Sequence, residues 1–145
     1  MGFGDGWGSN SGRGAAGRQM KGRCAPGGVG SGTEFLAAQY LSERGYTIRR
    51  RNYAARGGEI DIIAEKDGVV AFVEVRFRQS TRFGTPAETV TWAKRRRITR
   101  SALNFMAENR ASLEGRAFRF DVISMSMEDG RLVFEHFRNA FEAWT

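Results

Sequence analysis

Two acidic residues interrupt apolar segments whose composition is typical of buried β-strands. Asp61 is flanked by isoleucines and Glu74 by valines, and each lies six residues from the nearer end of the turn Asp67-Gly68. Charged groups are rarely buried without a partner, because removing a charge from water is unfavourable. A tight turn pairs its flanking strands as an antiparallel hairpin, so the equal spacing predicts that the two carboxylates face each other, roughly 5 Å apart.

Carboxylates at that separation repel each other unless a proton or a cation lies between them. A divalent cation would satisfy both, and Arg76 shares a strand face with Glu74. Metal-assisted hydrolysis of a phosphodiester needs carboxylates that hold the metal, an activated water, and a cation that stabilises charge on the phosphate. The spacing Asp61-x12-Glu74-x-Arg76 supplies these groups. The alternative is an acid–arginine pair in which Arg76 neutralises one carboxylate and no metal binds.

The composition limits both the metal and the partner. The only cysteine is Cys24 and the only histidine is His136, so a cysteine-rich zinc site is excluded and the ligands must be oxygens. Mg²⁺ or Mn²⁺ prefers that donor set. The formal net charge of +7 favours a nucleic-acid partner, with a charge that only aids solubility as the alternative. No apolar run could span a bilayer or act as a signal peptide, so we expect a cytoplasmic protein without a membrane partner.

Two regions of different composition divide the chain. Residues 1–32 hold 12 of the 19 glycines and few large apolar side chains, which predicts a flexible basic tail. Residues 33–145 carry the apolar periodicity of a folded domain. Its expected first element is a helix at Thr33–Arg44, with Thr33 as N-cap and Glu34 in the first turn.

The remaining elements follow from alternating and helical apolar patterns. They are strands at Tyr46–Arg51, Glu59–Glu65 and Val69–Arg78, a long helix opened by Pro86, strands at Ala117–Met127 and Arg131–Phe137, and a final turn of helix. The order α-β-β-β-α-β-β predicts an α/β or α+β domain with a mixed central sheet flanked by helices.

Several of these segments resemble a known family. TEFLAAQYL, RNYAARGGEIDIIA, VVAFVEVRFR and RFDVI, with Lys94 on the second helix, are similar to the YraN-like family of predicted endonucleases. That family lies within the PD-(D/E)XK superfamily, which includes restriction enzymes and archaeal Holliday-junction resolvases. The resemblance runs from about Gly32 to Trp144 and implies a restriction-endonuclease-like core. GEID followed by VEV-x-x-R is fairly specific, whereas an Asp…Glu-x-Lys pattern alone is common.

The resemblance implies roles for individual positions. Asp61 and Glu74 would be metal ligands, with the carbonyl oxygen of Val75 as a third. Glu34 would reach the metal or its water, unless it only complements the dipole of its helix. Glu59, the glutamate of GEID, would lie at the rim of the site or be a solvated acid at a strand end.

The sequence departs from the superfamily at Arg76, where lysine is usual. Arginine can stabilise charge on a phosphate, but it does not give up its proton at neutral pH. Lys94 is the candidate for a lysine that has migrated within the site, with an ordinary solvated residue as the alternative. Asp121 resembles a family motif, or it pairs with Arg119 or the backbone, and His136 is interpreted as structural.

Runs of basic residues flank these acids along the chain. We expect them to contact the phosphate backbone and to give salt-sensitive, largely sequence-independent binding. A solvated surface is the alternative for any one run. The residues are Arg49, Arg50, Arg51, Arg56, Arg78, Arg82, Lys94, Arg95, Arg96, Arg97 and Arg100.

The sequence supports three hypotheses. The first is a Mg²⁺- or Mn²⁺-dependent endonuclease acting on DNA, with branched or damaged DNA as substrate by analogy and a homodimer as the form that would act on two strands. The second is a nucleic-acid-binding module with an inactive site, motivated by Arg76. The third is a structural or protein-interaction domain, expected if salt-dependent binding of nucleic acid is absent.

Overall fold

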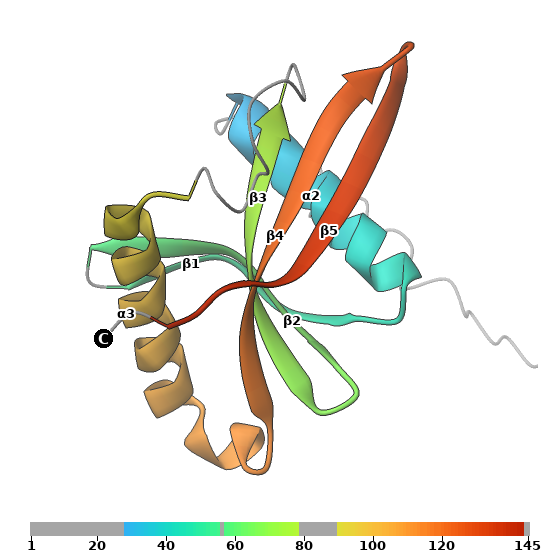
Figure 1. Ribbon diagram of the computed structural model, residues 1–145. Helices are drawn as coiled ribbons and strands as arrows, with labels where there is room; N and C mark the ends of the chain where they lie inside the picture. The colour runs from blue at the N-terminus through green and yellow to red at the C-terminus, as the bar shows by residue number, and fades with distance from the viewer. Residues whose placement is uncertain (1–27, 56, 79–89, 144–145) are drawn as a thin grey trace, which may run out of the picture. The chain divides into compact units, whose positions relative to one another are not determined.

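The folded part of the protein is a five-stranded mixed sheet with one helix packed on each face (Figure 1). The computed structural model describes residues 28–55, 57–78 and 90–143. The chain divides into two compact units, Met1–Gly32 and Thr33–Thr145, and the sheet belongs to the second. The elements are α2 (Gly28–Glu43), β1 (Thr47–Ala55), β2 (Gly58–Lys66), β3 (Val69–Arg78), α3 (Trp92–Glu108), the 3₁₀ helix η1 (Arg110–Leu113), β4 (Ala117–Glu128) and β5 (Arg131–Phe141).

The strands lie in chain order across the sheet, from β1 to β5. All neighbours pair antiparallel except β3 and β4, which are parallel and are connected through α3. A parallel pair needs a crossover of this kind, whereas antiparallel strands need only a short turn. The predicted order α-β-β-β-α-β-β is therefore confirmed, and the arrangement matches a restriction-endonuclease-like core.

The β2–β3 hairpin has the register predicted from its turn. Asp67 and Gly68 have φ values of 51° and 75°, as a two-residue type I′ turn requires. Pairing runs outward from this turn and ends at Ile62↔Val73. Asp61 and Glu74 are the next residues on the two strands, so they lie opposite each other as expected.

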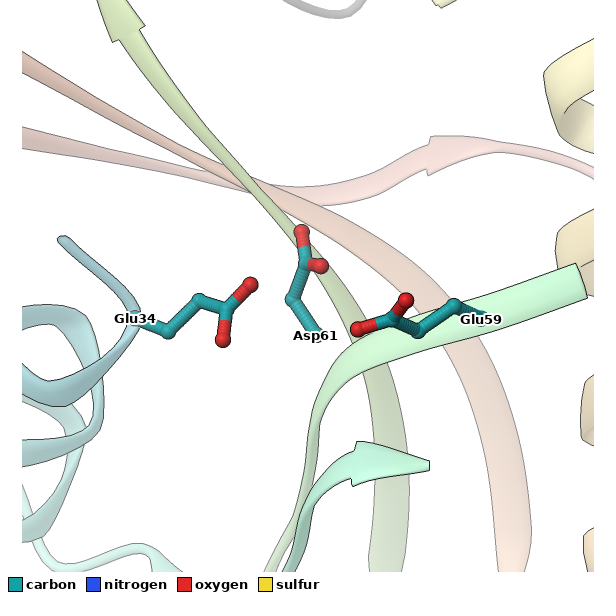
Figure 2. Close-up of side chains that lie close together, drawn as sticks. All are labelled: Glu34, Glu59 and Asp61. Carbon is teal, nitrogen blue, oxygen red and sulfur yellow. The ribbon is translucent and has the colours of Figure 1, made fainter. Parts of the chain in front are cut away.

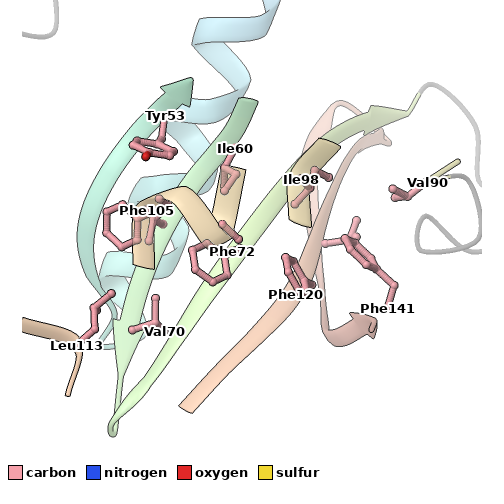
Figure 3. Close-up of a cluster of buried hydrophobic side chains, with 13 residues drawn as sticks. Tyr53, Ile60, Val70, Phe72, Val90, Ile98, Phe105, Leu113, Phe120 and Phe141 are labelled. Carbon is pink, nitrogen blue, oxygen red and sulfur yellow. The ribbon is translucent and has the colours of Figure 1, made fainter. Parts of the chain in front are cut away.

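Both faces of the sheet are buried, which explains the nearly continuous apolar runs in the central strands. Phe72 of β3 lies on the face covered by α3, where it contacts Phe105 and Phe120 in the larger hydrophobic cluster (Figure 3). Val73, the next residue, lies on the opposite face in a second cluster with Leu41 of α2. This alternation follows from the two-residue period of a strand.

Helix α2 begins earlier than the sequence predicted. Its first residue is Gly28, so Thr33 lies inside the helix and is not its N-cap, and its first turn contains no acidic residue. Glycines are poor helix formers, but extending a helix that has already nucleated is much easier than starting one. The reading of Glu34 as a partner for the dipole of the first turn is therefore wrong.

Three other expected boundaries also differ. Helix α3 starts at Trp92, with Thr91 Oγ1 accepting a hydrogen bond from the Lys94 amide at 3.2 Å, while Pro86 lies outside the described residues. Strand β1 continues to Ala55, and β5 continues to Phe141 where a turn of helix was expected. Pairing with neighbouring strands extends both, which local propensity does not reveal. In the described part of the chain, neither helix has the length and hydropathy that a membrane crossing demands.

Candidate active site

The candidate site lies where β2 and β3 separate. Their pairing ends at Ile62↔Val73, although β2 starts at Gly58 and β3 continues to Arg78. Asp61 occupies this fork, and its Oδ2 accepts a hydrogen bond from the Val75 amide at 2.8 Å. The side chain thus satisfies a backbone group that β2 no longer pairs with, and this contact fixes the orientation of the carboxylate.

Three carboxylates converge at the fork. Glu34 comes from α2, and Glu59 and Asp61 come from β2 (Figure 2). One oxygen from each lies within 4.8 Å of the others. Hard cations bind carboxylate oxygens at about 2.0–2.6 Å, so two ligands of one ion lie up to about 5 Å apart. The three acids therefore fit a single divalent cation, and Glu59, predicted at the rim, belongs to this group.

The carboxyl of Glu34 is hard to ionise in this setting. Burial and the adjacent charge and hydrogen bond of Asp61 raise its pKa to about 7, and Glu59 contributes in the same direction. A hydrogen bond from the Asn52 side chain opposes the shift. Crowded carboxylates of this kind bind either protons or a metal.

Asn52 is a site residue that the sequence reasoning missed. It lies on β1, within the stretch that pairs with β2, and has a φ of 52°. Asparagine tolerates this left-handed conformation better than most residues, and it is disfavoured in regular strands. Those two preferences were the available signal, because an asparagine in an apparent strand indicates an irregularity.

Glu74 lies beside this group and links it to α3. Its side chain is buried, and burial together with the charge of Asp61 raises its pKa to about 7. Lys94 opposes the shift, because its Nζ lies 3.2 Å from Glu74 Oε1. Glu74 Oε2 has no hydrogen-bond partner among the described residues. A buried carboxylate oxygen left without a partner is unfavourable, so it is available to a bound ion or water.

Arg76 makes a weaker contact with Glu74 than Lys94 does. Its Nε lies 3.8 Å from Glu74 Oε1 and, among the described residues, forms no hydrogen bond. A simple acid–arginine pair therefore does not account for this cluster. Val75 donates its backbone amide to Asp61, and the expected role of its carbonyl oxygen as a metal ligand stays a prediction.

The basic residues divide into those held by other side chains and those open to solvent. Arg49 forms an ion pair with Glu65 and lies near Ser112, which ties its guanidinium to the fold. Stacking over aromatic rings holds three more, with Arg50 over Tyr53, Arg51 over Phe35 and Arg95 over Trp92. Arg78 is half-buried, and Arg56 and Arg82 lie outside the described residues.

Three arginines of α3 are exposed. The side chains of Arg96, Arg97 and Arg100 make no hydrogen bond or ion pair with any residue that the structure describes. They follow Lys94 on the same helix, whose first turn contains no acid. This helix therefore presents exposed positive charge near an acidic cluster, the combination that a polyanionic substrate and a metal require together.

A second polar cluster is structural, as expected. Asp121 is completely buried on β4 and receives hydrogen bonds from Arg119 and His136, both at 2.8 Å, and from the Asn139 amide at 3.0 Å. Burial opposes ionisation of this carboxyl, but the hydrogen bonds outweigh it and lower its pKa. Arg119 also donates to the Tyr46 hydroxyl. Asp121 thereby joins β5 to β4 where their register shifts.

Comparison with known proteins gives one consistent result. The model of the uncharacterised protein family UPF0102 matches residues 33–125. A UPF0102 protein of Myxococcus xanthus is 40% identical over 79% of this chain and 89% of its own length. UPF0102 proteins of Lachnoclostridium phytofermentans and Symbiobacterium thermophilum are each 46% identical, over 77% and 79% of this chain and over 90% and 97% of their own lengths.

Proposed function

The chain belongs to the UPF0102 family, within the restriction-endonuclease-like superfamily, and we propose that it is a divalent-metal-dependent endonuclease that hydrolyses phosphodiester bonds in DNA. One observation carries the proposal. Oxygens of Glu34, Glu59 and Asp61 lie within 4.8 Å of one another, beside a buried Glu74 that is paired with a lysine. Structural ion pairs do not require three carboxylates at one point, because like charges at this distance repel.

The residues suit Mg²⁺ or Mn²⁺, since all the donors are carboxylate oxygens. Glu34, Glu59 and Asp61 would hold the ion. When bound, it would supply Lewis-acid stabilisation of the charge that builds on the phosphate. The Val75 amide would keep Asp61 oriented toward the ion, because this hydrogen bond leaves the other carboxylate oxygen available.

Two side chains would take part in the reaction directly. Glu74 would accept a proton, and Lys94 would stabilise negative charge. Glu74 Oε2 is buried and has no hydrogen-bond partner among the described residues, so the ionised carboxylate can accept a proton from an attacking water there. The water oxygen forms a bond to phosphorus as a phosphorus–oxygen bond of the backbone breaks. The products are a phosphate monoester and a hydroxyl. Lys94 Nζ, at 3.2 Å from the other oxygen of Glu74, would place positive charge beside the reacting phosphate.

A second candidate function is nucleic-acid binding without cleavage. The observation that favours it is the engagement of Glu74 with Lys94, together with the arginine at position 76. A lysine that remains bound to Glu74 would compete with the proton transfer described above. In that case Glu34, Glu59 and Asp61 would hold a cation that supplies positive charge for a phosphate, and no bond would break.

Asp61→Asn separates these functions from a structural role. Asparagine keeps an oxygen that can accept from the Val75 amide and removes only the charge, so the fork should remain intact. We expect cleavage of linear, nicked, flap or four-way DNA in Mg²⁺ or Mn²⁺ to be lost in this variant and kept in Glu128→Gln, which alters an exposed acid on β4. The same cleavage assay with RNA of matched sequence tests whether the substrate is DNA or RNA.

Two further measurements sharpen the test. Calorimetric titration of Mn²⁺ into the wild type and Asp61→Asn measures metal binding without any substrate. No heat of binding in the wild type would contradict the metal-dependent proposal. Arg76→Lys, in the cleavage assay, distinguishes a dormant site that regains activity from one that binds nucleic acid only.

A further inference from the structure

A depression of about 500 Å³ lies between the β1–β2 end and the start of α3. Lys94 and Arg97 border it on the helix side, and Glu59 borders it on the strand side. Glu59 also belongs to the cluster of three carboxylates, and Lys94 is the lysine that pairs with Glu74. The depression is therefore continuous with the candidate active site.

Small residues form the floor of the depression. Ala54 is exposed there, and Gly57 has open space where a Cβ would be. At Gly58 the strand approaches α3 so closely that a Cβ would lie 2.5 Å from the Arg97 carbonyl oxygen. Ser101 Oγ donates to the Ala55 carbonyl at 3.1 Å and links α3 to β1. The two elements are thus held together beneath the depression, and among the described residues that line it only Glu59, Lys94 and Arg97 have long side chains.

Of the two cations that border this depression, Lys94 is paired with Glu74, whereas Arg97 forms no ion pair with a described residue. The Arg97 side chain is exposed and makes no ion pair or hydrogen bond with another described residue. Arg96 and Arg100 are exposed on the same helix and are likewise unpaired within the described part of the chain. An unpaired guanidinium at the edge of a recess binds a phosphate more favourably than one already engaged with an acid.

We propose that this depression binds the sugar–phosphate backbone of a single nucleic-acid strand, on one side of the phosphate that reaches the acid cluster. Arg97 holds a phosphate, and the alanine and glycine floor admits the backbone. We expect a single strand to enter the depression more readily than a duplex, in which the bases of two backbones are paired. This inference takes nucleic acid as the substrate class from the proposed function. It adds the place where the strand binds and the expectation that the bases of the strand are unpaired at that place.

The experiment measures binding of the full chain to a fluorescein-labelled oligothymidine by anisotropy in EDTA, so that no cleavage occurs. Arg97→Gln should weaken binding about tenfold, as expected for one charge-assisted phosphate contact. It should also reduce the slope of log affinity against log salt by about 0.7, the contribution of one phosphate contact on a single strand. Ala54→Glu, which fills the hollow and adds negative charge, should weaken binding at least as much. Arg131→Gln, at an exposed arginine beside the β4–β5 turn, is the matched control and should bind as the wild type does.

Unchanged binding in both Arg97→Gln and Ala54→Glu would overturn the proposal. So would a duplex competitor that displaces the oligothymidine as effectively as unlabelled single strand does. Both altered positions are exposed, and thermal unfolding followed by circular dichroism checks that each variant folds. Oligothymidine binding is measured without metal and is therefore independent of cleavage. A wild type that binds the oligothymidine but never cleaves nucleic acid would refute the proposed nuclease activity and would not contradict this binding site. Cleavage with normal binding in both variants would refute only this site.

Discussion

Neutralising Glu74 is expected to stabilise the metal-free protein at pH 8. The carboxyl is buried beside Asp61, and its pKa is raised to about 7 from an ordinary value of 4.5. In the unfolded chain it ionises near the ordinary value. The Glu74→Gln side chain resembles the protonated acid and carries no charge to desolvate, so the variant avoids the unfavourable ionised state.

The size and sign of the effect follow from linkage. A shift from 4.5 to about 7 corresponds to at most about 3 kcal/mol, at 1.36 kcal/mol per pKa unit. Between these two values the folded protein binds more protons than the unfolded chain, so the free energy of unfolding falls as pH rises and levels off above pH 7. Glu34, whose pKa is also about 7, acts in the same direction and leaves a residual slope in the variant.

Urea unfolding in EDTA at pH 5, 6, 7 and 8 measures this effect. The wild type should lose stability across the range, and Glu74→Gln should lose clearly less. Asp121 and Glu65 have lowered pKa values and titrate below this window, so they do not obscure it. Glu128→Gln, at an exposed position, should follow the wild type. Mn²⁺ added at pH 8 should restore stability to the wild type, because a cation replaces the missing protons.

A Glu74→Gln variant that is no more stable than the wild type at pH 8 would refute this reasoning. It would mean that the ion pair with Lys94 outweighs the burial and repulsion that Glu74 experiences. A wild type that becomes more stable from pH 5 to pH 8 in EDTA would refute it as well.

Three other changes have definite expected outcomes. Asp121→Ala removes a buried acid that Arg119 and other donors surround, and should cost about 3–5 kcal/mol in urea unfolding. Gly58→Ala forces a Cβ to within 2.5 Å of the Arg97 carbonyl oxygen and should cost about 1–3 kcal/mol in the same assay, with wild-type circular dichroism after folding. Lys94→Met removes the cation that lowers the pKa of Glu74, so the loss of stability between pH 5 and pH 8 should become larger than in the wild type.

Local turn chemistry made the hairpin around the site predictable. The two-residue turn Asp67-Gly68 sets the β2–β3 register, and counting outward from it along the sequence predicts that Asp61 lies opposite Glu74. The order of elements was predictable for the same reason, because alternating and helical apolar patterns are local signals. The irregular conformation at Asn52, opposite this hairpin, was not anticipated although an asparagine there was a usable indication.

Contacts between segments that are distant in the sequence were less predictable than the local turns and strand patterns. The pairing of Glu74 with Lys94 depends on how α3 crosses the sheet, and no spacing rule connects positions 74 and 94. The extension of β5 to Phe141 depends on pairing with Phe120 across a register shift. Both features arise from tertiary packing, which overrides local propensity. The convergence of Glu59 with Glu34 likewise required the position of α2 over the sheet.

The order of the acids along the chain has a consequence for how the protein folds. Glu34, Glu59, Asp61 and Glu74 all precede the crossover from β3 to β4, whereas Lys94 lies within that crossover, on α3. Pairing of β3 with β4 joins Val69 to Ala117 and must close a much longer loop. We therefore expect the negative charges to gather in the folding transition state before their lysine arrives. Refolding should then be faster at mildly acidic pH or in the presence of divalent ions, which stopped-flow measurements can follow.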